Sequence, residues 1–114
     1  MRLLRLLCVA VVLTVGAASA GVTGREWVSE IWAGTYGGVD YIIFKIADPA
    51  SGEPTNYAFE MDGSPLHDAW FSMIHHHRVV SGVTGIWITY GSPIAGLTKN
   101  SLDCYSISEI QYKQ

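Results

Sequence analysis

Apolar and polar residues alternate along most of the chain after residue 24, and this alternation predicts a mainly β domain. Residues 21–24 form a short lead into the first strand. The clearest run is 39–47, VDYIIFKIA, because β-branched and aromatic residues occupy both of its faces. The five predicted strands are 25–36, 39–47, 55–61, 83–90 and 104–113. Gly37-Gly38 predicts a hairpin turn, and the stretches 48–54 and 91–100, rich in Gly and Pro, predict loops.

One segment, Ser64 to Gly82, has the periodicity of an amphipathic helix instead. Ser64 is a good N-cap, Pro65 suits the first helical position, and Gly82 is expected to end the helix. Its apolar side chains recur at spacings of three and four and form one stripe. The stripe consists of Leu66, Ala69, Trp70, Met73, Ile74, His77 and Val80. We expect this stripe to pack on the strands, with Phe71 and His75 on the opposite face.

Three strands, a helix and two further strands is the element order of an OB-fold, a five-stranded Greek-key barrel. We predict this fold, with the helix closing one end of the barrel. A generic α+β sheet with one packed helix has the same element order, and it is the alternative.

The first 20 residues have the pattern of a secretory signal peptide. Arg2 and Arg5 precede an apolar run over 6–15, which is too short to span a bilayer, and Ala18-Ser19-Ala20 suits cleavage. We therefore expect a secreted or periplasmic protein without a membrane span, whose mature part, 21–114, is a single domain.

The charge of this domain argues against nucleic-acid binding. Without Arg2 and Arg5, five basic residues face ten acidic ones, whereas phosphate backbones are bound by clustered Lys and Arg. The domain keeps all four Trp, all six Tyr and all three Phe, which is enough for a core and a binding surface. Cys104 is its lone cysteine, and we expect it to be a buried thiol.

The sequence offers little support for catalysis or a metal site. His75, His76 and His77 are consecutive and so point about 100° apart on a helix, whereas helical metal pairs stand at i and i+4. No nucleophile elbow occurs. Acidic side chains on or beside the strands leave a carboxylate-pair hydrolase as an alternative. We expect no enzyme activity, no cofactor and no metal.

A binding module remains, and OB-folds bind oligonucleotides or oligosaccharides on one face. The acidic charge favours a sugar ligand over an oligonucleotide. Sugar-binding sites in proteins use aromatic rings and short polar side chains. The candidate glycan-binding residues are Trp27, Ser29, Trp32, Tyr36, Thr89 and Tyr90. Core packing is the alternative role for each of these aromatic residues.

Short motifs along the chain carry a resemblance to a known family. They are Glu26-Trp27, YIIFKI over 41–46, Ser81-Gly82 after the helix, ITY over 88–90, and a segment bearing Cys104. In these motifs the chain resembles the B subunits of bacterial AB5 toxins, of the subtilase-cytotoxin and typhoid-toxin type.

The resemblance implies an OB-fold, assembly into a pentamer, a separate toxin A subunit as partner, and non-catalytic recognition of cell-surface glycans, often sialylated. It places a sugar contact at Tyr90 and another near Ser29, and it makes Phe71 and His75 candidates for the subunit interface. The chain departs from the family in its disulfides, since Lys45 stands where the relatives have a cysteine. A periplasmic or secreted module that binds or inhibits another protein is the alternative function.

Overall fold

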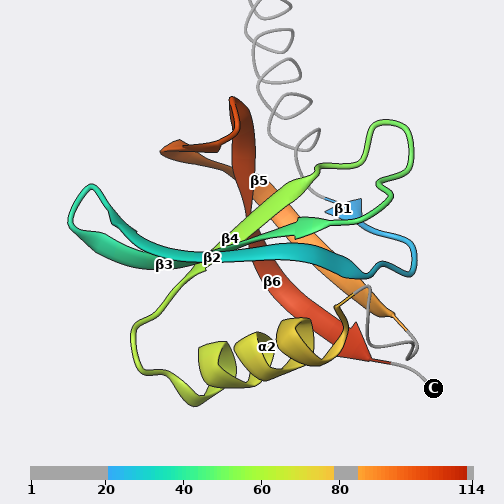
Figure 1. Ribbon diagram of the computed structural model, residues 1–114, viewed down its shortest axis with the longest axis horizontal. Helices are drawn as coiled ribbons and strands as arrows, with labels where there is room; N and C mark the ends of the chain where they lie inside the picture. Colours follow the sequence, from blue (N-terminus) through green and yellow to red (C-terminus); the bar gives the residue numbers. More distant parts are fainter. Residues whose placement is uncertain (1–20, 79–84, 113–114) are drawn as a thin grey trace, which may run out of the picture.

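The computed structural model describes residues 21–78 and 85–112, which form one mixed sheet with a helix packed against it (Figure 1). The elements are β1 (Gly21–Val22), β2 (Val28–Tyr36), β3 (Val39–Ile46), β4 (Asn56–Glu60), α2 (Pro65–His76), β5 (Ile86–Lys99) and β6 (Leu102–Tyr112). The six strands are ordered β1-β5-β6-β4-β3-β2. All neighbours are antiparallel except β4 and β6, which are parallel. The prediction of a mainly β protein with one helix is confirmed.

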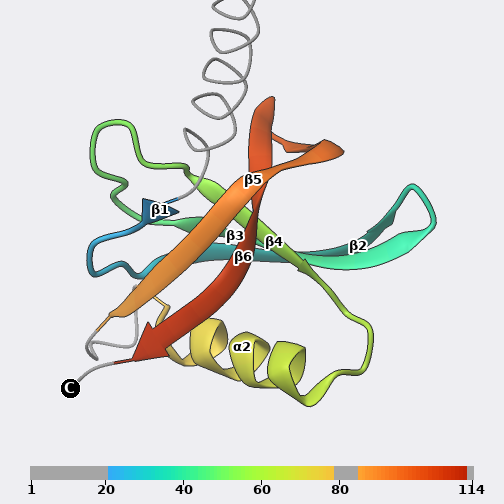
Figure 2. The ribbon, with the colours of Figure 1, turned by 180° about the vertical axis from the view of Figure 1, so that it is seen from behind.

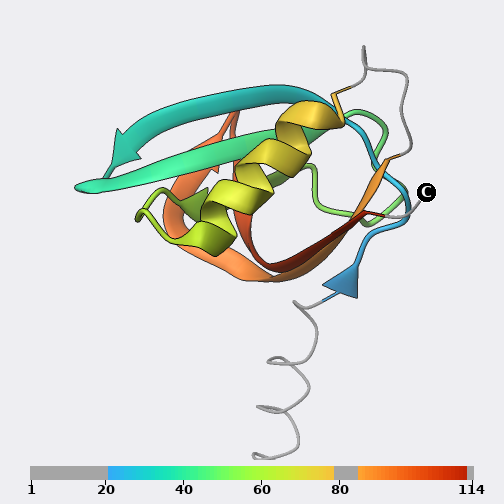
Figure 3. The same cartoon turned by 90° about the horizontal axis from the view of Figure 1, so that it is seen from below.

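The described strands form an open, curled sheet and not a closed barrel, and the sheet has six strands where five were predicted. The sheet is strongly curled, and α2 crosses its open end (Figure 3). Just before β2, the outer strand at one edge, Glu26 forms a bridge with Ile86 at the start of β5. The sheet has a sixth strand because Gly21 and Val22, predicted as a lead, pair with Tyr90 and Thr89.

The last hairpin also differs from the prediction, because β5 continues through the segment predicted as a loop. β5 and β6 run side by side and extend beyond the rest of the sheet (Figure 2). Irregularities in the register near Tyr90 and Pro93 absorb the Gly and Pro residues. The chain reverses at Asn100 and Ser101, both with positive φ (54° and 66°), as a type I′ hairpin turn requires.

The hairpin predicted at Gly37-Gly38 is confirmed. Both glycines have positive φ, 58° and 80°, which residues with a side chain rarely adopt. The turn joins β2 to β3 with Tyr36 paired to Val39.

The two faces of the sheet carry separate apolar clusters, because successive residues of a strand point to opposite faces. The main cluster lies on the side of α2 and receives residues from β2 to β6 and from the helix. Its buried members are Val28, Ile42, Phe44, Ile46, Tyr57, Phe59, Trp70, Ile74, Ile86, Ile88 and Ile110. The outer cluster consists of Ile43, Ala58, Leu97 and Cys104, with Trp32, Tyr36, Tyr41 and Ile94 packed against it. Cys104 is fully buried there as a free thiol, as predicted.

Helix α2 begins as predicted and ends earlier. Ser64 is the N-cap and Pro65 follows it. The last helical residue is His76, and His77 is the C-cap. The helix ends there because the chain turns to pair with β2, the His77 carbonyl accepting from the Val28 N–H at 2.9 Å. Gly82, predicted as the stop, lies outside the described residues.

Part of the predicted stripe forms the helix–sheet contact. Trp70, Ile74 and His77 are buried, whereas Leu66 remains 56% exposed. Phe71, predicted on the opposite face, packs partly against the main cluster, so the core accounts for much of its apolar surface. Val80, the Ser81-Gly82 motif and the signal peptide over 1–20 lie outside the described residues.

Replacing Ser64 by alanine is expected to lower the free energy of unfolding by about 1 kcal/mol. The Ser64 Oγ accepts from the His67 N–H at 3.1 Å, and alanine would leave this donor without its cap. Urea unfolding measures the change. Ser72→Ala, at an exposed position of the same helix, is the control and should change stability by less than about 0.5 kcal/mol. Equal effects of the two substitutions would contradict the capping role.

Candidate functional site

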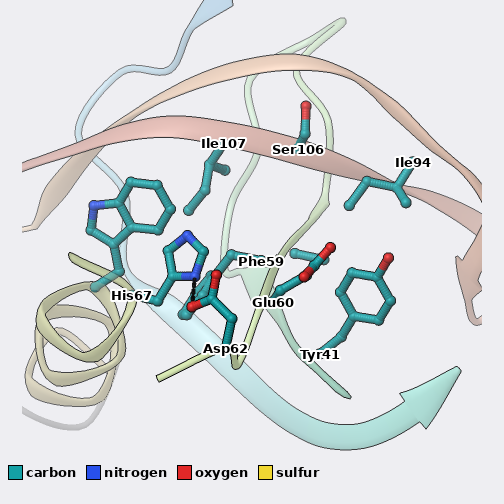
Figure 4. A pocket seen from close by; sticks show the side chains of 10 residues that line it. Tyr41, Phe59, Glu60, Asp62, His67, Ile94, Ser106 and Ile107 are labelled. Atoms are coloured by element: carbon teal, nitrogen blue, oxygen red, sulfur yellow. Dashed lines mark hydrogen bonds and ion pairs between the residues drawn. The ribbon is translucent and has the colours of Figure 1, made fainter. Parts of the chain in front are cut away.

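A cleft of about 390 Å³ lies between the start of α2 and the sheet (Figure 4). Its volume falls within the range of small-molecule sites. The lining residues come from β3, β4, the turn before α2, α2 itself, β5 and β6. They are Tyr41, Ala58, Phe59, Glu60, Asp62, His67, Trp70, Ile94, Ser106 and Ile107. Most elements of the fold therefore contribute a residue to the cleft.

On the helix side, a tight turn brings Asp62 and His67 together. Asp62 Oδ1 accepts from the Ser64 N–H at 3.0 Å and lies 2.9 Å from His67 Nδ1. The backbone N–H of Ser64, aided by the His67 ring, holds the pKa of Asp62 below its usual range. Asp62 is thus an anion at neutral pH, and as a carboxylate it can only accept, so His67 Nδ1 must carry the proton.

Aromatic packing fixes the His67 ring from behind. Its centroid lies 5.0 Å from that of Trp70 and 5.5 Å from that of Phe59. Trp70 and Phe59 meet edge to face at 5.5 Å within the main cluster. The imidazole consequently stands on a rigid aromatic base, which favours preorganised binding of a ligand.

The opposite wall combines apolar and polar side chains of three strands. Tyr41 and Glu60 pair across β3 and β4, so their side chains lie on one face of the sheet. Figure 4 shows the Glu60 carboxylate between Asp62 and the Tyr41 ring, with Ile94 beyond. Ser106 Oγ donates to the Ser92 carbonyl at 3.1 Å. The walls thus offer one partly exposed aromatic ring, two carboxylates, an imidazole and hydroxyl groups.

Two of the predicted glycan-binding residues lie next to this cleft. Trp32 and Tyr36 project from β2 on the outer face and belong to the outer cluster with Tyr41 and Ile94. The ring centroids of Tyr36 and Tyr41 are 6.5 Å apart. Lys99 Nζ stands 5.2 Å from the centroid of the Trp32 ring, so the Lys99 side chain covers part of the indole.

Tyr90 and Thr89 lie elsewhere. The Tyr90 ring packs between Tyr57 and Tyr105, each with its centroid 5.8 Å away, on the side of the main cluster. Gly21 lies against it, since a Cβ at Gly21 would be 2.5 Å from the Tyr90 hydroxyl oxygen. Thr89 lies beside Tyr90 on the opposite face and pairs with Glu109.

The remaining predicted site residues are also dispersed. Ser29 Oγ donates to the Lys45 carbonyl at 3.2 Å, and the Arg25 guanidinium stands 5.4 Å from the centroid of the Trp27 ring. The six predicted residues therefore do not form one surface. Of the two residues predicted at a subunit interface, His75 is exposed and lies 6.2 Å from the Phe71 ring, centroid to centroid.

Of the cleft residues, the sequence pointed to Glu60 and Asp62, as acidic side chains beside the strands that a carboxylate pair could use, and it also contained a signal for His67. In Asp62-Gly63-Ser64-Pro65, the aspartate begins a turn and the serine caps the helix. This combination brings residue 62 next to residue 67 in the first helical turn. Tyr41, Ile94 and Ser106 join them only through the pairing of distant strands, which the local pattern does not specify.

A second group of ionisable residues lies at the other end of the sheet. Glu26 is 5% exposed and its carboxyl group shares a hydrogen bond with that of Glu53. Glu53 also accepts from the N–H groups of Gly24 and Ala50, both at 3.2 Å. Burial, then the bond to Glu53 and the charges of Glu53 and Asp48, raise the pKa of Glu26 to about 8.

The pKa of Glu53 shifts in the opposite direction, below its usual value. Burial alone would raise its pKa, but the hydrogen bond from Glu26 and those from Gly24 and Ala50 lower it instead. One proton is thus held by Glu26 between the two carboxyl groups at neutral pH.

Among the described residues, no group of three or more His, Cys, Asp or Glu side chains has the geometry to hold a metal ion. Within the same residues, no helix has the length and apolar character that a membrane span requires.

Comparisons with models of protein families, with curated proteins and with solved structures find no match. The geometry of the cleft is therefore the basis for the functional proposal.

Proposed function

We propose that the protein is a secreted, non-catalytic glycan-binding module of the OB type, similar to toxin B subunits. In this proposal the cleft binds one sugar unit of a cell-surface oligosaccharide, and several copies in a ring supply avidity. The single observation that carries the proposal is the combination of the partly exposed Tyr41 ring with Glu60, Asp62 and His67 in one cleft. Sugars present both an apolar ring face and many hydroxyl groups, and this cleft complements both.

Features of the fold support the proposal as well. The helix lies between the third and fourth long strands, which is the OB element order. The Glu26–Ile86 bridge links the chain before β2, at one edge of the curled sheet, to the start of β5 near the other edge, as in a partly open barrel. Residues from several elements converge on the cleft, which is typical of a ligand site.

Replacing Tyr41 by alanine is expected to weaken glycan binding about ten-fold, equivalent to about 1.4 kcal/mol. The substitution removes the aromatic face on which the sugar ring would stack while leaving the carboxylates in place. A glycan array identifies the ligand, and isothermal titration calorimetry with that ligand measures the loss.

Tyr112→Ala is the matched control, because Tyr112 is 42% exposed and does not line the cleft. Its affinity for the glycan should equal that of the wild type. An array without any binder would contradict the proposal, and specific capture of a protein by the edge strand β2 would then favour the protein-binding alternative.

A further inference from the structure

The cleft presents hydrogen-bond acceptors more than donors. As carboxylates, Glu60 and Asp62 are acceptors only. Asp62 Oδ1 already accepts from Ser64 and His67, which leaves Oδ2 as the oxygen that a ligand would meet. Because His67 Nδ1 donates to Asp62, Nε2 is a further acceptor whenever the ring carries a single proton.

The remaining polar groups add little donor capacity. Ser106 Oγ directs its proton to the Ser92 carbonyl, and the Tyr41 hydroxyl is the one other side-chain hydroxyl of the lining. The indole N–H of Trp70 is a further donor, but that side chain is only 5% exposed. Within the part of the chain that the structure describes, neither Lys nor Arg lines the cleft. A ligand must therefore bring its own donors.

The charge of the cleft distinguishes classes of sugar. The carboxylate of a sialic acid would face Glu60 and Asp62 without a Lys or Arg partner, and such like-charge juxtaposition is unfavourable. A protonated amine would instead form charge-assisted hydrogen bonds with these carboxylates, which are about twice as strong as neutral ones. Neutral hydroxyl groups fall between these two cases.

We propose that the cleft selects sugars that carry a free amino group and rejects sialylated and other acidic sugars. This inference rests on the proposed glycan-binding function and names its ligand class. It differs from the sialylated ligands that the family resemblance implies. Glu60 is the principal determinant, because Asp62 is already engaged by two donors while the Glu60 carboxylate extends into the cleft beside Tyr41 (Figure 4).

The test is calorimetric titration in neutral buffer with a short glucosamine oligomer, its N-acetylated counterpart and sialyllactose. The wild type should bind the glucosamine oligomer about ten-fold more tightly than the N-acetylated one, and it should not bind sialyllactose. Glu60→Gln should abolish this preference, because it should weaken binding of the glucosamine oligomer much more than binding of the N-acetylated one. Glu109→Gln, at an exposed position of β6 outside the cleft, is the matched control and should keep the preference.

The possible failures are distinguishable. Sialyllactose binding that Tyr41→Ala removes, or equal affinity for the two glucosamine oligomers, would overturn the ligand class and leave glycan binding intact. Preference for the amine that persists in Glu60→Gln would overturn the role of Glu60. Absence of binding to any sugar, on the array and in solution, would overturn the proposed function itself.

Discussion

Phe44→Ala is expected to lower the free energy of unfolding by about 3–5 kcal/mol, a large part of the stability of a domain of this size. Phe44 is fully buried at the centre of the main cluster. Its ring stacks on Tyr57 at 5.5 Å and meets Phe59 edge to face at 6.4 Å, centroid to centroid. Alanine would leave a cavity between β3 and β4 that these aromatic rings cannot fill. Urea unfolding followed by tryptophan fluorescence measures the loss.

Leu102→Ala provides the comparison, because Leu102 is also a large apolar residue but is 49% exposed. Its effect should stay within about 0.5 kcal/mol. A Phe44→Ala variant as stable as Leu102→Ala would show that the main cluster does not form the core.

The stability of the protein is expected to fall between about pH 5 and pH 9, because of the carboxyl pair of Glu26 and Glu53. The pKa of Glu26 is about 8 in the folded chain against its usual 4.5 when unfolded. Between these values the folded chain holds a proton that the unfolded chain has released, so the free energy of unfolding decreases as pH rises. The contribution of Glu26 is complete below about pH 4.5 and lost above about pH 8.

Glu53 makes the stability depend on pH in the opposite direction under acidic conditions. Its pKa is lowered in the folded chain, so its contribution is present at neutral pH and is lost as pH falls below its usual range. The melting temperature should therefore be highest in mild acid and fall by at least on the order of 10 °C by pH 9.

Glu26→Gln separates titration from packing. The amide keeps the size of the side chain and a donor toward Glu53, yet it has no proton to lose near pH 8. Its melting temperature should be nearly constant between about pH 5 and pH 9, whereas Glu109→Gln should follow the wild type. A wild-type profile without a slope, or a slope retained in Glu26→Gln, would contradict this assignment.

Much of the fold can be predicted from local pattern alone. The alternation over 39–46 and the Gly37-Gly38 turn specify the β2–β3 hairpin, because both signals act within a few residues. The N-terminus of α2 is equally local, since Ser64 and Pro65 define it. What local pattern does not specify is the extension of β5. There, irregular strand pairing accommodates glycine and proline, and Leu97 is held by burial against Ile43 and Cys104.

The candidate site, too, is only partly predictable from local sequence. Asp62 and His67 are brought together by a turn and a helix N-terminus, and both of these are predictable from the local sequence. Tyr41 and Ile94 reach the cleft through the pairing of distant strands. The periodicity of each strand does not predict which strands pair. The aromatic residues selected as ligand contacts were chosen by type and strand, but Tyr90 packs between two tyrosines while Tyr41 lines the cleft.

The strand order has a consequence for the time course of folding. β1 pairs only with β5, and β4 pairs in parallel with β6, so nearly the whole chain must be available before either contact forms. Contacts this distant in sequence slow folding, and domains dominated by them fold in about milliseconds to seconds. During that interval the β2–β3 hairpin, which can form on its own, exposes the apolar surface and open edge that β4 later covers. A chaperone that shields this hairpin would protect the nascent domain from aggregation.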